Sequence, residues 1–293
     1  MKKRLQSVGE GRMNRDLSYF VDLEQFPLER RDSDRYQQLL SEAQAAIRTD
    51  GCFVLKSAFR PAALAEMQAE AASIEPLAHY TTNKVNVYFS KEDTSLPAGH
   101  PRRFMMDRSN GFVSGDCFPR ESVIRDLYLS ETLKQFIADC LEEAAIYHYA
   151  DPIASLTMNV NKPGDQFSWH YDTNEFTVTL LIQDCEEGGV FQYAPNIRNK
   201  YDEYYDDVSA LLHGDYSRVK ELKLNEGDLQ IFKGRYALHR ATEARGSTTR
   251  NLVVFTYTEK DNVIGSGFRS MELYGKQLDI HYQDRVRSDA LED

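Results

Sequence analysis

The sequence predicts an α+β protein in which N-terminal helices pack on a β-barrel or jelly-roll core. Two observations along the 293 residues support this prediction. The first third of the chain carries hydrophobic residues at helical spacing. After residue 150 the apolar segments become short and rich in β-branched or aromatic residues, and Gly, Asp, Asn or Pro bounds each of them. Many short strands at close spacing are typical of a barrel or a double-sheet jelly roll.

Two helices separated by a strand are expected near the N-terminus. Residues 33–51 carry apolar side chains at helical spacing, and Gly51 follows as a stop signal. The apolar segment 52–59 is expected to be a strand. Proline suits the first turn of a helix, so Pro61 marks the start of the second helix, over residues 60–76.

A third helix is expected over residues 130–143, before the pattern changes to that of a β-protein. Leu156, Met158 and Val160 then alternate with polar residues, as the residues of a half-buried strand do. Further strands are expected at residues 175–183, 188–194, 228–234, 236–241 and 251–258.

No linker or internal repeat divides the chain, so residues 1–293 are expected to form a single domain. Within it, residues 1–150 form a mainly helical part with a substrate loop, residues 151–260 form the jelly-roll core, and residues 261–293 form a C-terminal extension. The charged, Tyr-rich segment 197–227 interrupts the strands. We expect it to be a partly helical insertion near the mouth of the barrel, where such segments often act as lids.

The composition is that of an acidic globular protein. Because the formal net charge is −11, the chain is not expected to bind nucleic acid. Its apolar runs are far shorter than a membrane span, and the basic N-terminus lacks the apolar core of a secretory signal. The four cysteines lie far apart without a CxxC pair, which argues against a thiolate metal site and a disulfide scaffold. A cytoplasmic location is expected, and no feature indicates an oligomeric state.

The stretch FSWHYDTNEF places His170 and Asp172 two residues apart, just before an apolar run. In an extended strand such residues point to the same face, so both could bind one metal ion. His239, which lies between two strand-like segments, could supply a third ligand from a neighbouring strand. Two histidines and one carboxylate leave three metal positions open, which suits Fe(II). An isolated His-x-Asp pair at the surface is the alternative interpretation.

Arg250 opens an apolar strand eleven residues after His239. Its guanidinium could form a bidentate pair with a bound carboxylate beside the metal. Arg245 is a competing candidate, but it lies in a predicted turn where water would solvate it. For Arg250 itself, a surface salt bridge of small energetic value is the alternative.

These segments carry a family resemblance. WHYDTNEFTVTLLIQ, EEGGVFQYAP, GDLQIFKGRYALHRAT and RNLVVFTYT resemble the double-stranded β-helix, or cupin-like jelly-roll, core of the Fe(II)/2-oxoglutarate-dependent oxygenases. The resemblance covers roughly residues 100 to 260. More closely, the chain is similar to the branch that contains halogenases and hydroxylases of free lysine and related amino acids. It implies Fe(II), 2-oxoglutarate and O2 as cofactors, with Arg250 holding the distal carboxylate of 2-oxoglutarate.

The resemblance also implies a reaction. In the halogenases of this branch a small residue replaces the metal-binding carboxylate, and chloride takes its place. This sequence keeps Asp172, which implies a dioxygenase that hydroxylates a small molecule, expected to be a free amino acid or a derivative. The rival interpretation is a cupin-like barrel that binds a ligand without catalysis. Such a barrel would be expected to have lost part of the metal triad or Arg250.

Candidate substrate-binding residues come from two places. In a polar-aromatic loop before the barrel, Arg103 could bind a substrate carboxylate and Asp107 an amine. Thr173 and Asn174 follow the ligand strand and could contact a polar substrate, although a simple turn is an equal alternative. Trp169, the single tryptophan, could form a wall of the pocket or could be a core aromatic.

Overall fold

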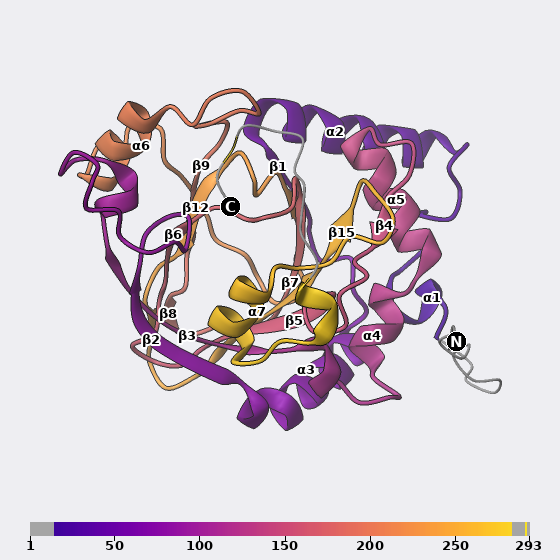
Figure 1. The fold of residues 1–293 in the computed structure, drawn as a ribbon. Coiled ribbons are helices and arrows are strands. Elements are labelled where there is room, and N and C mark those ends of the chain that lie inside the picture. Colours follow the sequence, from indigo (N-terminus) through magenta and orange to yellow (C-terminus); the bar gives the residue numbers. More distant parts are fainter. Residues whose placement is uncertain (1–14, 283–290, 292–293) are drawn as a thin grey trace, which may run out of the picture.

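A computed structural model describes residues 15–282 and residue 291 of the chain (Figure 1). The α-helices are α1 (Leu17–Phe20), α2 (Asp34–Asp50), α3 (Pro61–Ile74), α4 (Val123–Tyr128), α5 (Glu131–Leu141), α6 (Tyr205–Leu212) and α7 (Gly267–Tyr274). Short 3-10 helices are η1 (Glu75–Leu77), η2 (Pro101–Arg103), η3 (Gly115–Cys117) and η4 (Asp279–Tyr282). The strands are β1 (Cys52–Leu55), β2 (His79–Val85), β3 (Met106–Val113), β4 (Tyr147–His148), β5 (Leu156–Asn161), β6 (Phe167–His170), β7 (Thr177–Gln183), β8 (Glu187–Gly188), β9 (Phe191–Ala194), β10 (Lys220–Leu222), β11 (Leu229–Phe232), β12 (Leu238–Ala241), β13 (Ala244–Arg245), β14 (Arg250–Phe255) and β15 (Tyr257–Thr258).

The strands form two main antiparallel sheets, which confirms the prediction of a jelly-roll core. The larger sheet has the order β1-β11-β7-β14-β5-β3-β2, and the smaller has the order β10-β9-β12-β6. Two further pairs, β13-β8 and β15-β4, are short. Neighbours such as β14 and β5 lie about 90 residues apart in sequence, so long-range pairing holds the core together.

The two faces of the larger sheet have different neighbours. On β5, Leu156, Met158 and Val160 point into the main hydrophobic core, which also contains the buried faces of α2 to α5. The alternate residues Thr157 and Asn159 line a cavity on the other face. Figure 1 shows these helices gathered on the side of the molecule away from β6, β9 and β12. The helices therefore support the larger sheet from outside and leave its inner face for a ligand.

Local signals place the N-terminal elements as expected. The Ser33 hydroxyl accepts a hydrogen bond from the backbone N–H of Tyr36 at 3.2 Å and caps α2. Gly51 ends that helix with a φ of 67°, a left-handed conformation that glycine adopts at little cost. Pro61 is the first residue of α3, where its missing N–H removes no helical hydrogen bond.

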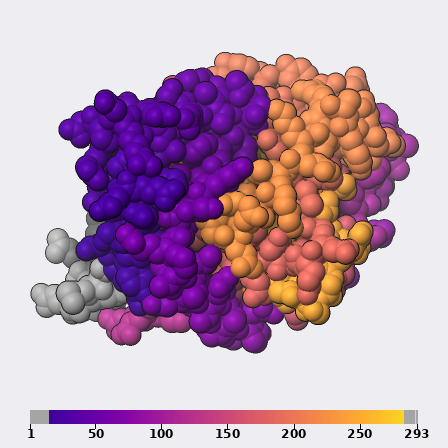
Figure 2. All heavy atoms as spheres, turned by 180° about the vertical axis from the view of Figure 1, so that it is seen from behind, coloured from indigo at the N-terminus to yellow at the C-terminus, as the bar shows by residue number. Residues whose placement is uncertain are grey.

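The N-terminal part is less helical than expected. It supplies β1, β2 and β3 to the larger sheet, so this sheet draws strands from both sides of residue 150. The expected loop before the barrel contains β3, which pairs with β2 and β5. Figure 2, the opposite face of the molecule, shows early (indigo) and later (orange) segments side by side in one continuous surface.

The insertion over residues 197–227 contains α6 and β10, and little of it borders the cavity over which a lid was expected. Of its residues, only Leu224 lines the cavity. The insertion packs instead on the loop around η2, where the Ser209 hydroxyl donates to the carbonyl of Gly99 at 2.7 Å. The C-terminal helix α7 borders the cavity in its place. Among the described residues, no helix is both long and apolar enough to span a bilayer.

Candidate metal centre

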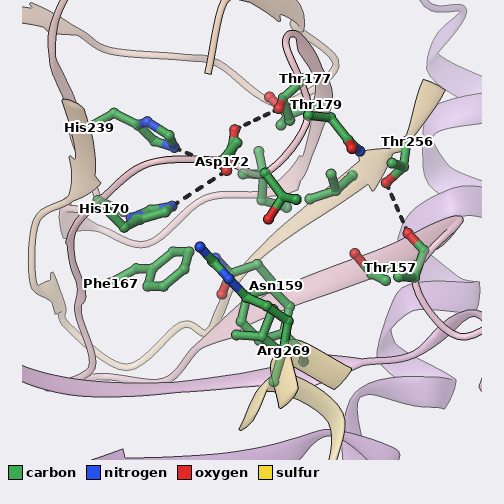
Figure 3. A pocket seen from close by; sticks show the side chains of 18 of the residues that line it. Thr157, Asn159, Phe167, His170, Asp172, Thr177, Thr179, His239, Thr256 and Arg269 are labelled. Atoms are coloured by element: carbon green, nitrogen blue, oxygen red, sulfur yellow. Dashed lines mark hydrogen bonds and ion pairs between the residues drawn. The ribbon is translucent and has the colours of Figure 1, made fainter. Parts of the chain in front are cut away.

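Three predicted ligands converge at one end of the cavity (Figure 3). His170 ends β6, Asp172 follows two residues later, and His239 lies on β12 directly opposite His170 in the strand register. The Asp172 Oδ1 atom is 3.8 Å from His170 Nε2 and 3.5 Å from His239 Nε2. One ligand atom from each residue lies within 4.8 Å of the others, close enough for a single metal ion to contact all three.

Backbone carbonyls orient both imidazoles. His170 Nδ1 lies 2.8 Å from the carbonyl oxygen of Ser168, and His239 Nδ1 lies 2.8 Å from that of Ala237. A carbonyl only accepts hydrogen bonds, so each Nδ1 must carry the proton and donate it. The Nε2 lone pairs are then left free toward Asp172, which is the arrangement that metal-binding histidines require.

The Asp172 carboxylate is held from its other side. Its Oδ2 accepts a hydrogen bond from the Thr177 hydroxyl at 2.5 Å, so Oδ1 remains for a metal. A Cβ atom at Gly234 would lie only 2.0 Å from Oδ2, so glycine is required there. Sequence reasoning missed both positioning residues, because neither belongs to the ligand motif.

Charge states in this cluster favour metal binding. Burial, helped by the neighbouring His239, holds the pKa of His170 well below its usual value, so His170 is neutral at neutral pH. Burial alone would raise the pKa of Asp172, but the two imidazoles and the Thr177 hydroxyl outweigh it and lower the pKa below its usual range. Neutral imidazoles and an ionised carboxylate are the forms that bind metal.

The cavity next to the triad has a volume of about 180 Å³ and lies between the two sheets. Polar side chains of the larger sheet and aromatic rings share its walls. The polar side chains are Thr157, Asn159, Thr177, Thr179 and Gln230. The phenylalanine rings are those of Phe89, Phe112, Phe167, Phe176, Phe191 and Phe232. A cavity of this size and mixed character suits a small, partly polar molecule.

Arg250 lines the same cavity from the first position of β14. Its side chain is buried, and its Nε and Nη1 atoms have no hydrogen-bond partner among the described residues. The Asp184 Oδ1 atom lies 3.7 Å from Nε, too far for a hydrogen bond. A buried guanidinium with unused donors fits a carboxylate ligand, because buried donors that make no hydrogen bond are costly. The triad and Arg250 thus fit Fe(II) and the carboxylate of 2-oxoglutarate.

The other expected site residues divide into two groups. Thr173 and Asn174 line the cavity. Trp169 is not among the lining residues. It is buried in a second hydrophobic cluster with the Arg240 guanidinium 4.6 Å from its ring centre, which supports the core alternative.

Arg103 and Asp107 do not line the cavity, so the structure corrects their expected role. Arg103 donates from Nη1 to the carbonyl of Leu96 at 3.0 Å. Asp107 lies on β3 with 76% of its side chain exposed and pairs with Lys84 at 3.2 Å. A strand sends alternate residues to opposite faces, and Asp107 falls on the outer one.

Comparisons with known proteins agree with this geometry. The family model described as Halogenase D matches residues 36–268. The fold is similar to that of the epimerase SnoN in complex with Fe3+, alpha ketoglutarate and nogalamycin RO, with a TM-score of 0.52, 14% identity, and coverage of 76% of this chain and 84% of that one. No curated protein matches the chain at a significant level of sequence similarity.

Two further structures have similar folds. A prolyl hydroxylase from Trichoplax adhaerens, in complex with a hypoxia inducible factor peptide fragment, gives a TM-score of 0.51 at 12% identity, covering 78% of this chain and 96% of that one. AviO1 from Streptomyces viridochromogenes Tue57 gives a TM-score of 0.51 at 16% identity, covering 76% and 96%. At these identities the likeness establishes the fold.

Proposed function

We propose that this chain, which belongs to the Halogenase D family, is an Fe(II)- and 2-oxoglutarate-dependent oxygenase. Its proposed reaction is the hydroxylation of a free amino acid or a close derivative. The cofactors expected from the sequence, Fe(II), 2-oxoglutarate and O2, are those of the oxygenase superfamily whose fold the chain shares. The observation that carries the choice of hydroxylation is the Asp172 carboxylate beside His170 and His239.

Different residues would bind the metal ion and 2-oxoglutarate. His170 Nε2, Asp172 Oδ1 and His239 Nε2 would bind Fe(II), and Arg250 would bind the distal carboxylate of 2-oxoglutarate. When bound, Fe(II) and 2-oxoglutarate supply the activation of O2 and the oxidation of a C–H bond, and 2-oxoglutarate leaves as succinate and CO2. The protein contributes position and the exclusion of water.

The chain's own residues prepare this site before any ligand arrives. The hydrogen bonds to Ser168 and Ala237 fix the imidazoles, and Thr177 fixes the carboxylate. Such prior orientation lowers the cost of assembling the site. The phenylalanine rings around the cavity keep water from the reacting groups, and the row of threonine hydroxyls can orient a polar substrate.

The family description raises halogenation as the second candidate. A halide bound to the metal would need a free position where Asp172 now stands. The carboxylate is ionised, and Thr177 and Gly234 hold it in place. A halide entering the same place would meet a like charge at short distance. This arrangement supports hydroxylation over halogenation.

A barrel that only binds a ligand is the remaining rival. Such a barrel has no need for two imidazoles aimed at one carboxylate. It also has no need for a buried guanidinium whose donors await a second small acid. The presence of both the metal triad and Arg250 supports an enzyme over a binding barrel.

The test is turnover by purified protein. Protein with Fe(II), 2-oxoglutarate and chloride is incubated with each of the proteinogenic free amino acids, and succinate and product masses are measured. We expect substrate-stimulated succinate and a product that has gained one oxygen atom. A chlorinated product would assign the protein to the halogenases, and no stimulation across the panel would favour the binding barrel. The His239→Ala variant is the matched inactive control.

A further inference from the structure

Two arginines besides Arg250 line the cavity, Arg240 and Arg269. The Arg240 guanidinium is engaged by the Gln192 side chain and the Trp169 ring, so Arg269 is the one considered for a ligand. Arg269 lies on the first turn of α7, just beyond the segment that matches the family model. It lines the cavity, and Figure 3 shows its guanidinium pointing inward toward His170. Nothing in the metal triad or in the expected 2-oxoglutarate site uses this side chain.

Backbone and aromatic contacts hold Arg269 in this direction. Ser266 caps α7, since its hydroxyl accepts a hydrogen bond from the backbone N–H of Arg269 at 3.2 Å. The Nη2 atom donates to the carbonyl of Tyr88 at 3.4 Å. The guanidinium carbon lies 4.8 Å from the ring centre of Phe89, which is cation–π distance. The guanidinium is therefore positioned before any substrate binds.

The wall behind Arg269 carries further positive charge. Arg108 is fully buried and contacts the same Phe89 ring at 5.3 Å. Its Nη1 and Nη2 atoms have no hydrogen-bond partner among the described residues, and the Glu272 Oε1 atom is 3.6 Å from Nη1. Two guanidinium groups thus share the ring of Phe89, and Glu272 is the carboxylate beside that of Arg108. Buried positive charge of this kind favours an anion in the adjoining space.

Carboxylates of the cavity wall are already engaged. Among the described lining residues the acids are Asp151 and Asp172. Asp151 Oδ1 accepts hydrogen bonds from the backbone N–H groups of Ile153 and Ala154. Its Oδ2 accepts from the backbone N–H of Gly265 at 3.0 Å and lies 2.9 Å from His281 Nε2. Asp172 belongs to the triad, so the wall offers no uncommitted acid for an ammonium group.

We propose that Arg269 binds the carboxylate of the substrate. The protein would then recognise its substrate through this carboxylate rather than through an amine. The substrate class is then a small carboxylic acid, free amino acids included. Arg250 would then bind 2-oxoglutarate, and Arg269 would bind the substrate. A planar guanidinium matches a carboxylate through two parallel hydrogen bonds. This inference rests on the proposed function, because it assumes that the cavity is a substrate site.

The experiment measures binding without turnover. Full-length protein loaded with Mn(II) and 2-oxoglutarate is screened by thermal shift and then titrated by calorimetry. The probes are the proteinogenic L-amino acids, their carboxamides, short-chain carboxylates and inorganic phosphate. The variants are Arg269→Gln, Arg269→Lys and, as a matched control, Arg245→Gln, whose side chain is 63% exposed outside the cavity. Melting temperatures without ligand show whether each variant is folded.

In the wild type, at least one free acid should bind at least about tenfold more tightly than its carboxamide, because a hydrogen-bonded charge pair is lost in the amide. Arg269→Gln should remove that preference, so that acid and amide bind alike. Arg269→Lys keeps the positive charge but loses the bidentate geometry of the guanidinium, so it should retain part of the preference for the acid. Arg245→Gln should retain all of it.

The assignment would be overturned by equal binding of acid and amide to the wild type, by a preference that persists in Arg269→Gln, or by binding of phosphate with no carboxylate bound. Binding of no probe would also overturn it for acids of this size. Succinate formation by the Fe(II)-loaded wild type is measured in parallel. If no succinate forms, the proposed oxygenase function is rejected. The preference for acid over carboxamide is measured with the manganese-loaded protein, so it tests the role of Arg269 independently of that result.

Discussion

The two ends of the cavity are built in different ways. At the metal end, His170 and His239 face each other across paired strands, and backbone carbonyls orient both imidazoles. At the other end, contacts with distant segments hold α7 and the chain that follows it. The Thr81 hydroxyl donates to the carbonyl of Glu272 in α7, and Asp151 makes a buried contact with His281 of η4. Strand register fixes the positions of the metal-binding residues, whereas a few long-range contacts fix the position of α7. Substitutions at the two ends should therefore have separable effects.

The largest effect is expected from Asp172→Ala, which removes a metal ligand. Changing a residue that merely supports a ligand typically costs 10- to 100-fold, so loss of the ligand itself should cost more than about 100-fold in hydroxylation. Chloride could then enter the vacated position, and a chlorinated product is sought by mass spectrometry. Asp107→Ala, which removes an exposed aspartate outside the cavity, is the matched control and should remain active. Full hydroxylation by Asp172→Ala would remove Asp172 from the mechanism.

Arg250→Ala should raise the KM for 2-oxoglutarate by about 100-fold or more. Two charge-assisted hydrogen bonds would be lost, each worth about 1.5–3 kcal/mol. Steady-state succinate formation measures the change. Arg245→Ala serves as the control, since that side chain lies outside the cavity wall. An unchanged KM in Arg250→Ala would place the 2-oxoglutarate carboxylate elsewhere.

Thr177→Val should weaken Fe(II) binding by about tenfold, the size typical of a lost supporting hydrogen bond. The substitution removes the hydroxyl that bonds Asp172 Oδ2 while it keeps the shape of the side chain. Thr179→Val removes a hydroxyl from the same strand that bonds Gln230 instead, and it should leave Fe(II) affinity unchanged. Equal effects of the two substitutions, in anaerobic Fe(II) titrations, would contradict the positioning role.

His281→Ala should change stability but not Fe(II) affinity, which sharpens the contrast between the two ends. His281 Nδ1 accepts a hydrogen bond from the backbone N–H of Leu278, so Nε2 must donate to Asp151. Loss of that buried bond should lower the free energy of unfolding by about 1–3 kcal/mol, measured by urea denaturation. His213→Ala, at an exposed histidine, is the control. A matching fall in Fe(II) affinity would show that the ends are coupled.

The same contrast explains how far the sequence could predict the site. His170, Asp172 and Arg250 were accessible because strand periodicity and strand starts are local signals. Arg269 was missed, because it lies in a C-terminal segment whose position depends on contacts with residues far away in sequence. The expected role of Arg103 failed for a related reason. The chain after it pairs as β3 within the larger sheet, and local composition does not reveal such long-range pairing.

The most direct test is a crystal structure of the protein grown without O2 in the presence of Fe(II) and 2-oxoglutarate. The anomalous signal of iron should lie between His170 Nε2, Asp172 Oδ1 and His239 Nε2. The distal carboxylate of 2-oxoglutarate should contact the guanidinium of Arg250, with Arg269 facing the remaining space. Iron bound at another place, or 2-oxoglutarate held by Arg269 and not by Arg250, would contradict the account.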